Sequence, residues 1–342
     1  MQKFEVYDDK TVLITGGTGS FGHAFTEQLL QYSKPKKIII FSRDEMKQWE
    51  MAKLFSGHPS VRFLLGDVRD RDRLYRAFDG VDYIIHAAAT KIVTTAEYNP
   101  FECIKTNVIG AMNVVDAAID RGVSRVVALS TDKASSPINL YGASKLASDK
   151  IFLSANVYSS ERSETKFSVV RYGNVMGSRG SVIPFFMNLS DNEPIPITDP
   201  AMTRFMISLD QGIELVNEAM NSMHGGEVFV KKIPSMNIVE IANTIIPGRE
   251  HKIIGIRPGE KIHEQMIASD EARVTYDCGG HFVIVSESEV LKQLYSEKYK
   301  LVPSKFVYSS ELNEDWMTAE ELKSFINSSA HKFVQTRHIT SI

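Results

Sequence analysis

The segment STDKASSPINLYGASK, residues 130–145, places a tyrosine and a lysine four positions apart. If this segment ends in a helix, Tyr141 and Lys145 lie on the same helix face. A free phenol, with a pKa near 10, is a poor base at neutral pH, but a neighbouring ammonium group favours the phenolate. The pair therefore predicts removal of a proton from a hydroxyl group while hydride leaves the same carbon atom.

An acidic and a basic residue, Asp132 and Lys133, stand just before this pair. An elimination of water needs an acid for the departing oxygen and a base for the proton, and the two side chains could supply both. Neighbouring residues on a strand point to opposite faces, so both can reach one substrate only if the strand ends near Ser130. The alternative interpretation is an ordinary charged pair in a surface loop.

A lysine acts as a base only when its pKa is lowered well below its ordinary value. We expect Lys91, Lys145 and the positive charge of a nicotinamide cofactor to lower the pKa of Lys133 by like-charge repulsion in a dry pocket.

A glycine-rich turn, TGGTGSFG, follows the first expected strand and opens a helix. Glycines three positions apart permit a tight turn and let backbone N–H groups approach a pyrophosphate. A purely structural turn is the alternative. The context favours a bound dinucleotide, for which the expected ligands in this turn are Gly16, Thr18, Gly19, Ser20, Phe21 and Gly22.

The end of the second expected strand bears on which dinucleotide binds. Enzymes that use NAD usually place an acidic side chain there, whereas this chain has Ser42, Arg43 and Asp44, with Lys47 one turn later. Arg43 and Lys47 could pair with a 2′-phosphate, which favours NADP, while Asp44 could instead accept from a ribose hydroxyl. Further along the chain, the expected cofactor neighbours are Asp67, Val68, Ala87, Ala88 and Lys91.

These motifs require a particular order of strands and helices. Short, fully apolar runs alternate with amphipathic segments as far as Arg171, which predicts a parallel sheet covered on both faces, a doubly wound α/β fold. We expect an NADP-binding domain at residues 1–173, with 205–232 returning to it. Residues 174–204 and 233–280 would form a smaller α/β substrate lobe, and 281–342 a C-terminal extension.

Composition excludes several classes of protein. The chain has 342 residues and a net charge of −3, which gives no electrostatic case for binding nucleic acid. The two cysteines, Cys103 and Cys278, cannot form a disulfide framework, and neither they nor the nine histidines show metal-ligand spacing. No secretion signal or apolar run of membrane length is visible. We therefore expect a cytoplasmic protein without a metal ion.

Taken together, the motifs resemble those of the extended short-chain dehydrogenases/reductases, and more narrowly the inverting UDP-N-acetylglucosamine 4,6-dehydratases. The resemblance rests on TGGTGSFG, SRDEMKQ, GDVRD, HAAATK, STDKASSPINLYGASK, RYGNVMGSRGSVIPFF, ITDPAMTRF and IIGIRPGEKIHE, between about Val12 and Glu264. It implies tightly bound NADP that is regenerated in each cycle, the first step of pseudaminic acid synthesis for flagellin or surface glycosylation, and a homo-oligomer of two or six subunits.

The resemblance also assigns roles to residues. Lys133 is the implied base at carbon 5 of the sugar, where retaining dehydratases usually carry a glutamate, and Thr131 accompanies it. A UDP-sugar needs cationic and backbone donors for its phosphates. The expected substrate ligands are Lys91, Ser130, Thr131, Tyr172, Gly173, Asn174, Ser178, Arg179, Gly180, Ser181, Val182, Arg204, Arg257, Pro258, Gly259 and Glu260.

Some of these residues have simpler explanations. Asn174 could form a turn, and Arg204 could form a surface ion pair. Asn107 is expected to play a structural role, and His86 to pack near the cofactor without a catalytic role. The rival functions are a retaining dehydratase, a UDP-sugar 4-epimerase, a reductase that consumes free NADPH and a non-catalytic regulator that senses NADP.

Overall fold

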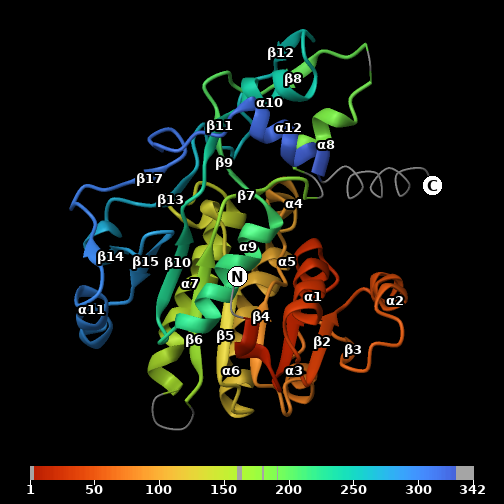
Figure 1. Cartoon of the computed structure of the whole chain (residues 1–342), viewed down its shortest axis with the longest axis vertical. Helices are drawn as coiled ribbons and strands as arrows, with labels where there is room; N and C mark the ends of the chain where they lie inside the picture. Colours follow the sequence, from red (N-terminus) through yellow and green to blue (C-terminus); the bar gives the residue numbers. More distant parts are fainter. Residues whose placement is uncertain (1–3, 160–163, 179–180, 191, 329–342) are drawn as a thin grey trace.

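The computed structural model describes residues 4–159, 164–178, 181–190 and 192–328. Its first half alternates strands with helices, as the sequence predicts (Figure 1). The strands are β1 (Thr11–Thr15), β2 (Lys37–Ser42), β3 (Val61–Leu65), β4 (Tyr83–His86), β5 (Arg125–Leu129) and β6 (Lys166–Arg171). The helices are α1 (Ser20–Tyr32), α2 (Glu45–Leu54), α3 (Arg71–Ala77), α4 (Val93–Tyr98), α5 (Pro100–Ile104), α6 (Gly110–Asp120) and α7 (Leu140–Ser159).

All six strands enter one large sheet, which also takes in β10 (Glu227–Lys231), β14 (Thr275–Asp277), β15 (His281–Val285) and β16 (Lys300–Leu301). The order is β16-β14-β15-β10-β6-β5-β4-β1-β2-β3. Strands from β3 to β10 run parallel, and β15 joins β10 in the antiparallel sense. The chain order reverses between β1 and β4, and ligands of doubly wound sheets bind at the carboxyl ends of the strands near such a point.

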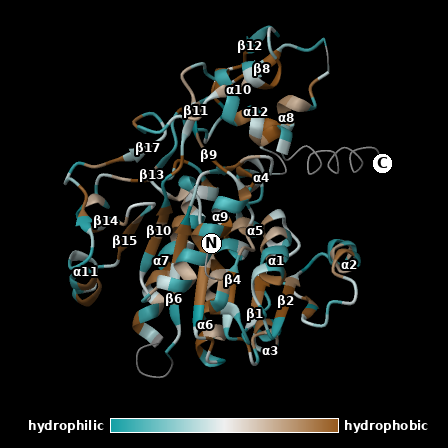
Figure 2. Ribbon diagram, viewed as in Figure 1, coloured by the Kyte–Doolittle hydropathy of each residue, from teal (hydrophilic) through white to brown (hydrophobic). Residues whose placement is uncertain are grey.

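Both faces of the sheet are buried, which explains why its central strands are apolar throughout. Leu13 packs into one hydrophobic cluster with helices α3, α6 and α7. Its neighbours Val12 and Ile14 pack into another, with α1, α2 and α9 (Leu209–Ser222). Figure 2 shows the apolar strands inside the more hydrophilic helices. The doubly wound α/β prediction is confirmed.

The helical segment from Pro100 to Asp120 is not a regular α-helix throughout. A π-helical turn, Lys105–Ile109, separates α5 from α6. Within it, the Asn107 side chain donates to the Thr90 carbonyl at 3.0 Å and to Ser144 Oγ at 2.9 Å, and accepts from the Thr90 N–H at 2.8 Å. Inserted turns of this kind often occur near functional sites. Asn107 thus has the structural role predicted for it.

A smaller lobe lies at one end of the sheet, at the top of Figure 1. Its strands are β7 (Asn174–Val175), β8 (Ile195–Ile197), β9 (Thr203–Ile207), β11 (Ser235–Asn237) and β12 (His251–Ile253), and its helices are α8 (Val182–Met187), α10 (Ile238–Ile245) and α12 (Ala319–Ser328). A separate hydrophobic cluster, which includes Ile197, Ile241 and Leu322, forms its core.

The expected domain boundaries need correction at two places. Strand β9 pairs with β7 and β11 of the lobe, although its Phe205 and Ile207 side chains pack into the core of the large sheet, so α9 is the first element that belongs to the large domain by both criteria. Residues 281–301 do not form a separate extension, because β15 and β16 extend the large sheet and α11 (Glu289–Ser296) packs against it. Strand β14, which was expected in the substrate lobe, extends the same sheet. The late pair β13 (Gln265–Ile267) and β17 (Tyr308–Ser309) joins the lobe segment to the C-terminal part.

No helix among the described residues is long and apolar enough to cross a membrane.

Candidate active site

A cavity of about 1410 Å³ is lined by residues at the carboxyl ends of the parallel strands and by residues of the lobe. It exceeds the ~1000 Å³ upper range of a pocket for one small ligand, so a dinucleotide and a second ligand can share it. Every residue expected to bind the cofactor lines this cavity except Gly22. All the expected substrate ligands line it too, apart from Arg179 and Gly180, which lie outside the described residues.

The glycine turn leaves no room for side chains. Gly16 has a φ of +63°, and a Cβ atom there would lie 2.8 Å from the Ala88 backbone. Gly19 occupies the N-terminal position of α1, where no side chain covers the helix terminus. An exposed helix N-terminus with bare backbone N–H groups is suited to a pyrophosphate. These residues fit a dinucleotide.

Gly22 serves packing instead of the ligand. A Cβ atom at this position would lie 2.1 Å from the carbonyl oxygen of Gly17, so the glycine lets α1 approach the turn closely. The expectation that Gly22 contacts the cofactor is therefore corrected to a supporting role.

The two charged residues that follow β2, Arg43 and Asp44, have different contacts. Asp44 caps α2 by accepting from the Lys47 N–H at 3.0 Å, and its carboxylate also pairs with the Lys47 ammonium at 3.0 Å. The Arg43 side chain is 67% exposed and lies 3.9 Å from Asp67, which is itself bound by Arg69. Asp44 is thus engaged in the helix cap, and Arg43 is the more available of the two for a ligand.

His86, at the end of β4, packs in the protein interior next to the cavity residue Ala87. His86 is buried and its Nδ1 lies 2.8 Å from the Thr15 hydroxyl. Burial, with a smaller effect from Lys145, lowers the pKa of His86 to about 3. This histidine is neutral and packed beside the cavity, as predicted.

Tyr141 and Lys145 lie on the first turns of α7, both buried except for the surface that lines the cavity. Burial raises the pKa of Tyr141 to about 12, against the opposing effects of the Lys133 charge and a hydrogen bond to Thr131. Burial also lowers the pKa of Lys145, and Asp149 opposes that change. Lys133 is therefore the cation that acts most strongly on the phenol in this structure.

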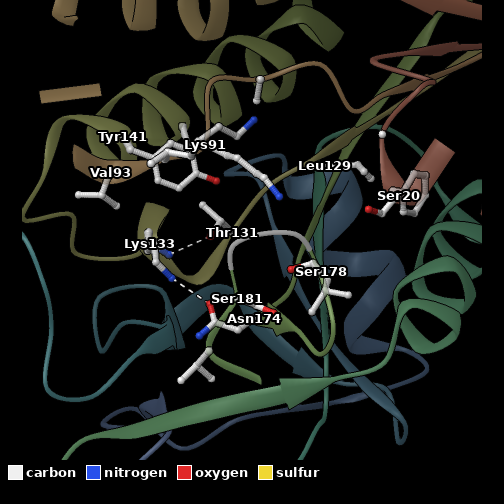
Figure 3. A pocket seen from close by; sticks show the side chains of 18 of the residues that line it. Ser20, Lys91, Val93, Leu129, Thr131, Lys133, Tyr141, Asn174, Ser178 and Ser181 are labelled. Carbon is white, nitrogen blue, oxygen red and sulfur yellow. Dashed lines mark hydrogen bonds between the residues drawn. The ribbon is translucent and has the colours of Figure 1, made fainter. Parts of the chain in front are cut away.

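The chain leaves β5 at Leu129, and residues Asp132–Ala134 form a short 3₁₀ turn capped by Thr131. The strand thus ends before Asp132 and Lys133, as it must if both side chains are to act on one substrate. Figure 3 shows Lys133 between Thr131 and Asn174, with Tyr141 facing the same space. The Lys133 ammonium donates to Asn174 Oδ1 at 3.2 Å and to Asp132 Oδ1 at 3.0 Å.

Asp132 differs from the other expected catalytic residues because it is fully buried and lies behind the cavity wall. Its Oδ2 atom has no hydrogen-bond partner among the described residues. Gly173 lines the cavity next to it, and a Cβ atom there would lie 3.5 Å from this oxygen. Burial raises the pKa of Asp132, although Lys133 opposes the change. Asp132 can therefore carry a proton.

The expectation that Lys91 and Lys145 lower the pKa of Lys133 is wrong. Burial by itself would lower that pKa, but the carboxylates of Asp132 and Glu264 more than offset it and raise it above the ordinary value. Arg204 is a cation that opposes this increase. The structure therefore favours an ammonium ion on Lys133.

Glu264 was not singled out by its sequence. Its carboxylate is 2% exposed, lines the cavity and lies 3.2 Å from the Lys133 ammonium. The two residues are far apart in the chain, and only the folded lobe brings them together. The one available indication was an acidic residue at the end of the IIGIRPGEKIHE segment.

The two described arginines among the expected substrate ligands, Arg204 and Arg257, have different surroundings. Arg204 is buried and donates to the carbonyls of Thr203, Ile262 and Lys261, so its guanidinium holds the lobe segment together at the cavity wall. Arg257 is exposed and carries no such set of bonds in the described residues. This arrangement makes Arg257 the better candidate for a phosphate.

Comparisons with known proteins agree with this geometry. The family of polysaccharide biosynthesis proteins matches residues 12–286. A UDP-N-acetylglucosamine 4,6-dehydratase (inverting) of Campylobacter jejuni subsp. jejuni serotype O:23/36 (strain 81-176) is 51% identical over 331 residues, which cover 94% of this chain and 98% of the relative. A UDP-glucose 4-epimerase of Rickettsia bellii (strain RML369-C) is 41% identical, with 94% and 96% covered.

Solved structures are similar as well. Pen from Bacillus thuringiensis is 38% identical with a TM-score of 0.86, and the match covers 95% of this chain and 98% of that one. A double mutant of DesIV, a dTDP-glucose 4,6-dehydratase from Streptomyces venezuelae with NAD and DAU bound, is 25% identical with a TM-score of 0.65, covering 73% and 86%.

Proposed function

The chain belongs to the polysaccharide biosynthesis protein family within the extended short-chain dehydrogenases/reductases, and from this premise we propose that it is an inverting UDP-N-acetylglucosamine 4,6-dehydratase. The reaction would give UDP-2-acetamido-2,6-dideoxy-β-L-arabino-hex-4-ulose. Its place as the first step of pseudaminic acid synthesis for flagellin or surface glycosylation, a cytoplasmic location and a homo-oligomeric state belong to the same proposal and rest on resemblance.

One observation carries this proposal. Lys133, Tyr141 and Lys145 line one cavity, and a buried carboxyl group able to hold a proton, Asp132, lies directly behind its wall in contact with the Lys133 ammonium. A simple 4-epimerisation needs a Tyr–Lys pair alone, whereas loss of water needs an additional acid and base. The arrangement supplies both kinds of group in contact with each other.

A nicotinamide dinucleotide is the cofactor that the glycine turn fits, and when bound it supplies reversible hydride transfer. The bare backbone at Gly16 and Gly19 would hold its pyrophosphate. We propose NADP over NAD, because Arg43 is available to a 2′-phosphate while Asp44 is engaged as a helix cap. The DesIV structure contains NAD, so the affinities of this protein for NADP and NAD test the preference directly.

Within the cavity, each catalytic residue has a separate task. Tyr141 accepts the proton of the hydroxyl at carbon 4, and the charges of Lys133 and Lys145 favour its phenolate. Lys133 passes its ammonium proton to the Asp132 carboxylate, which it contacts, and as a neutral amine removes the proton at carbon 5. Asp132 donates a proton to the hydroxyl that leaves carbon 6. Lys133 and Asp132 are 3.0 Å apart, so the acid and base functions are in direct contact.

Incubation with UDP-N-acetylglucosamine in deuterated water, without added nicotinamide cofactor, tests the proposal. We expect a 4-keto-6-deoxy sugar with deuterium at carbon 5 and inverted configuration there. Absence of that product, or deuterium with the original configuration, contradicts the inverting assignment. Steady loss of NADPH absorbance with added NADPH would indicate a reductase, and dinucleotide binding without any turnover would indicate a regulator.

A 4-epimerase is a second candidate, because the similar protein of Rickettsia bellii carries that name. An epimerase would change only the configuration at carbon 4, keep the hydroxyl at carbon 6 and incorporate no deuterium at carbon 5. The same incubation therefore separates the two activities by product analysis.

A further inference from the structure

Glu264 contacts the catalytic turn from a distant segment of the chain. Its Oε1 atom lies 3.2 Å from the Lys133 ammonium, which also lies 3.0 Å from Asp132 Oδ1. The ammonium group is thus held between two carboxylates from distant parts of the chain. The second oxygen of Glu264, Oε2, is buried and has no hydrogen-bond partner among the described residues.

The backbone of Glu264 is fixed in place. Its N–H donates to the Ser310 hydroxyl at 2.9 Å, and its carbonyl accepts from the Ser310 N–H at 2.8 Å. The Ser310 hydroxyl in turn lies 2.7 Å from that of Thr203 on β9. The C-terminal segment therefore holds this glutamate against the lobe. A carboxylate fixed in this way restricts where the Lys133 side chain can lie.

The same segment is tied to the catalytic turn at two further points. The Lys261 ammonium donates to the Ser135 carbonyl at 2.7 Å, and the Asn139 side-chain amide donates to the Gly259 carbonyl at 2.7 Å. Gly259 has a φ of +77°, and a Cβ atom there would lie 2.9 Å from Asn139. Close contact between the lobe and the catalytic turn is thus built into the segment that carries Glu264.

The two carboxylates beside Lys133 have different electrostatic surroundings. Burial acts to raise the pKa of Glu264, but Lys133, Arg204 and Lys261 together lower it below its ordinary value. The pKa of Asp132 is raised, by burial and also by the negative charge of Glu264. The groups that face the Lys133 ammonium are Asp132, Glu264, Arg204, Lys261 and Tyr141. Among them, Glu264 is the carboxyl group that stays ionised.

We propose that Glu264 is a positioning residue for this reaction: its carboxylate is the counter-ion that holds the Lys133 ammonium in the cavity and leaves Asp132 free to carry a proton. The inference rests on the proposed function, because it concerns the acid and base of the dehydration. It divides the two carboxyl groups by task, since Glu264 balances the charge and Asp132 supplies the acid.

The variant Glu264→Gln tests this role because it removes the charge and keeps the size of the side chain. Loss of a negative charge lowers the pKa of both Lys133 and Asp132. We expect the whole profile of kcat against pH to move to lower pH by about 1 unit, with a lower maximum. A lower maximum without displacement would indicate a merely structural residue and would overturn the proposal.

Two matched variants support the comparison. Glu264→Asp keeps the charge on a shorter side chain, so its profile should stay at the wild-type pH with a reduced maximum. Asp270→Asn removes an exposed carboxylate six residues later and should leave the profile unchanged. A displacement in Asp270→Asn equal to that in Glu264→Gln would show a general charge effect and would also overturn the proposal.

A second measurement does not depend on turnover. Acetic anhydride modifies only neutral amines, and the Lys133 side chain is 22% exposed. Mass spectrometry of the Lys133 peptide after labelling at a series of pH values gives the pH midpoint of its reactivity. We expect a midpoint about 1 unit lower in Glu264→Gln than in the wild type and in Glu264→Asp.

The two readouts separate the two hypotheses. If the wild type forms no 4-keto-6-deoxy product, the proposed function fails, and the labelling alone decides whether Glu264 is the counter-ion of Lys133. If product forms and the labelling midpoint is the same in Glu264→Gln as in the wild type, the role of Glu264 fails while the proposed function stands.

Discussion

The hydroxyl group of Ser130 donates a hydrogen bond of 2.6 Å to Asp149, and both residues are buried. Ser130 follows β5 and precedes the catalytic turn, while Asp149 lies one helical turn after Lys145 on α7. Asp149 also lies 3.9 Å from Arg171, whose guanidinium pairs with Glu271 at 3.0 Å. The Ser130–Asp149 bond therefore joins the catalytic turn to the helix that carries Lys145.

Replacement of Asp149 by asparagine should lower the pKa of Lys145. Burial already lowers the pKa of Lys145, and Asp149 is the group that opposes this change. If Lys145 acts as an ammonium ion, activity falls as the pH rises through its pKa. In Asp149→Asn that decline should begin about 1 pH unit lower than in the wild type. The measurement is kcat against pH.

Lys150→Gln is the matched control for this helix, because Lys150 is the next residue and is exposed. Its pH profile should equal that of the wild type. An unchanged alkaline decline in Asp149→Asn would mean that this carboxyl group does not support the charge of Lys145.

Replacement of Lys133 by alanine should abolish the elimination and leave cofactor binding intact. Loss of a general base typically costs about 10²–10⁴-fold in rate, and Lys133 lies in the lobe-facing part of the cavity away from the glycine turn. Product formation measures the first effect, and titration with NADP monitored by fluorescence measures the second. Retention of more than about a tenth of the wild-type rate would exclude Lys133 as the base.

Replacement of Arg43 by alanine should weaken binding of NADP and leave that of NAD nearly unchanged. A charged hydrogen bond contributes about 1.5–3 kcal/mol, but this side chain is largely exposed, so we expect a loss of about tenfold in NADP affinity. Calorimetric titration of the cofactor-free protein with both dinucleotides gives the two affinities. Lys36→Ala, at an exposed residue before β2, is the control. Equal losses for NAD and NADP would argue against recognition of a 2′-phosphate.

Much of the fold could be predicted from sequence because the strands of the large sheet are buried on both faces. Fully apolar runs such as residues 38–41 have few alternatives once they alternate with helices. The glycine turn and the Tyr141–Lys145 pair were also predictable, since each depends on local spacing. The glycine turn, Tyr141 and Lys145 lie around one cavity because parallel strands all end at the same edge of the sheet.

Long-range pairing explains what the sequence did not reveal. The charge state of Lys133 depends on Glu264, which lies 131 residues later in the chain, and no local pattern marks that contact. The break between α5 and α6 depends on hydrogen bonds from Asn107 to Thr90 and Ser144. The added strands β14 and β15 depend on an antiparallel edge of the large sheet that only the folded chain provides. Asp149, by contrast, was within reach, because it follows Lys145 at helical spacing.

His86 gives the protein a pH-dependent stability that can be tested without any ligand. The Thr15 hydroxyl accepts from the Ala88 N–H at 3.3 Å and can donate its own proton to His86 Nδ1. This bond requires a neutral imidazole, and burial lowers the pKa of His86 to about 3. In the unfolded chain the pKa is about 6.5, so between these values the unfolded state binds more protons than the folded state.

The free energy of unfolding should therefore rise with pH between about pH 3 and 6.5, and the contribution of His86 should be lost as the pH falls. The slope from one such group is at most about 1.4 kcal/mol per pH unit. Urea unfolding at several pH values measures it, and His86→Asn should reduce the slope by that amount, whatever its effect on overall stability. His58→Asn, at an exposed histidine, should leave the slope unchanged. An equal slope in the wild type and His86→Asn would mean that His86 does not have to lose its proton when the chain folds.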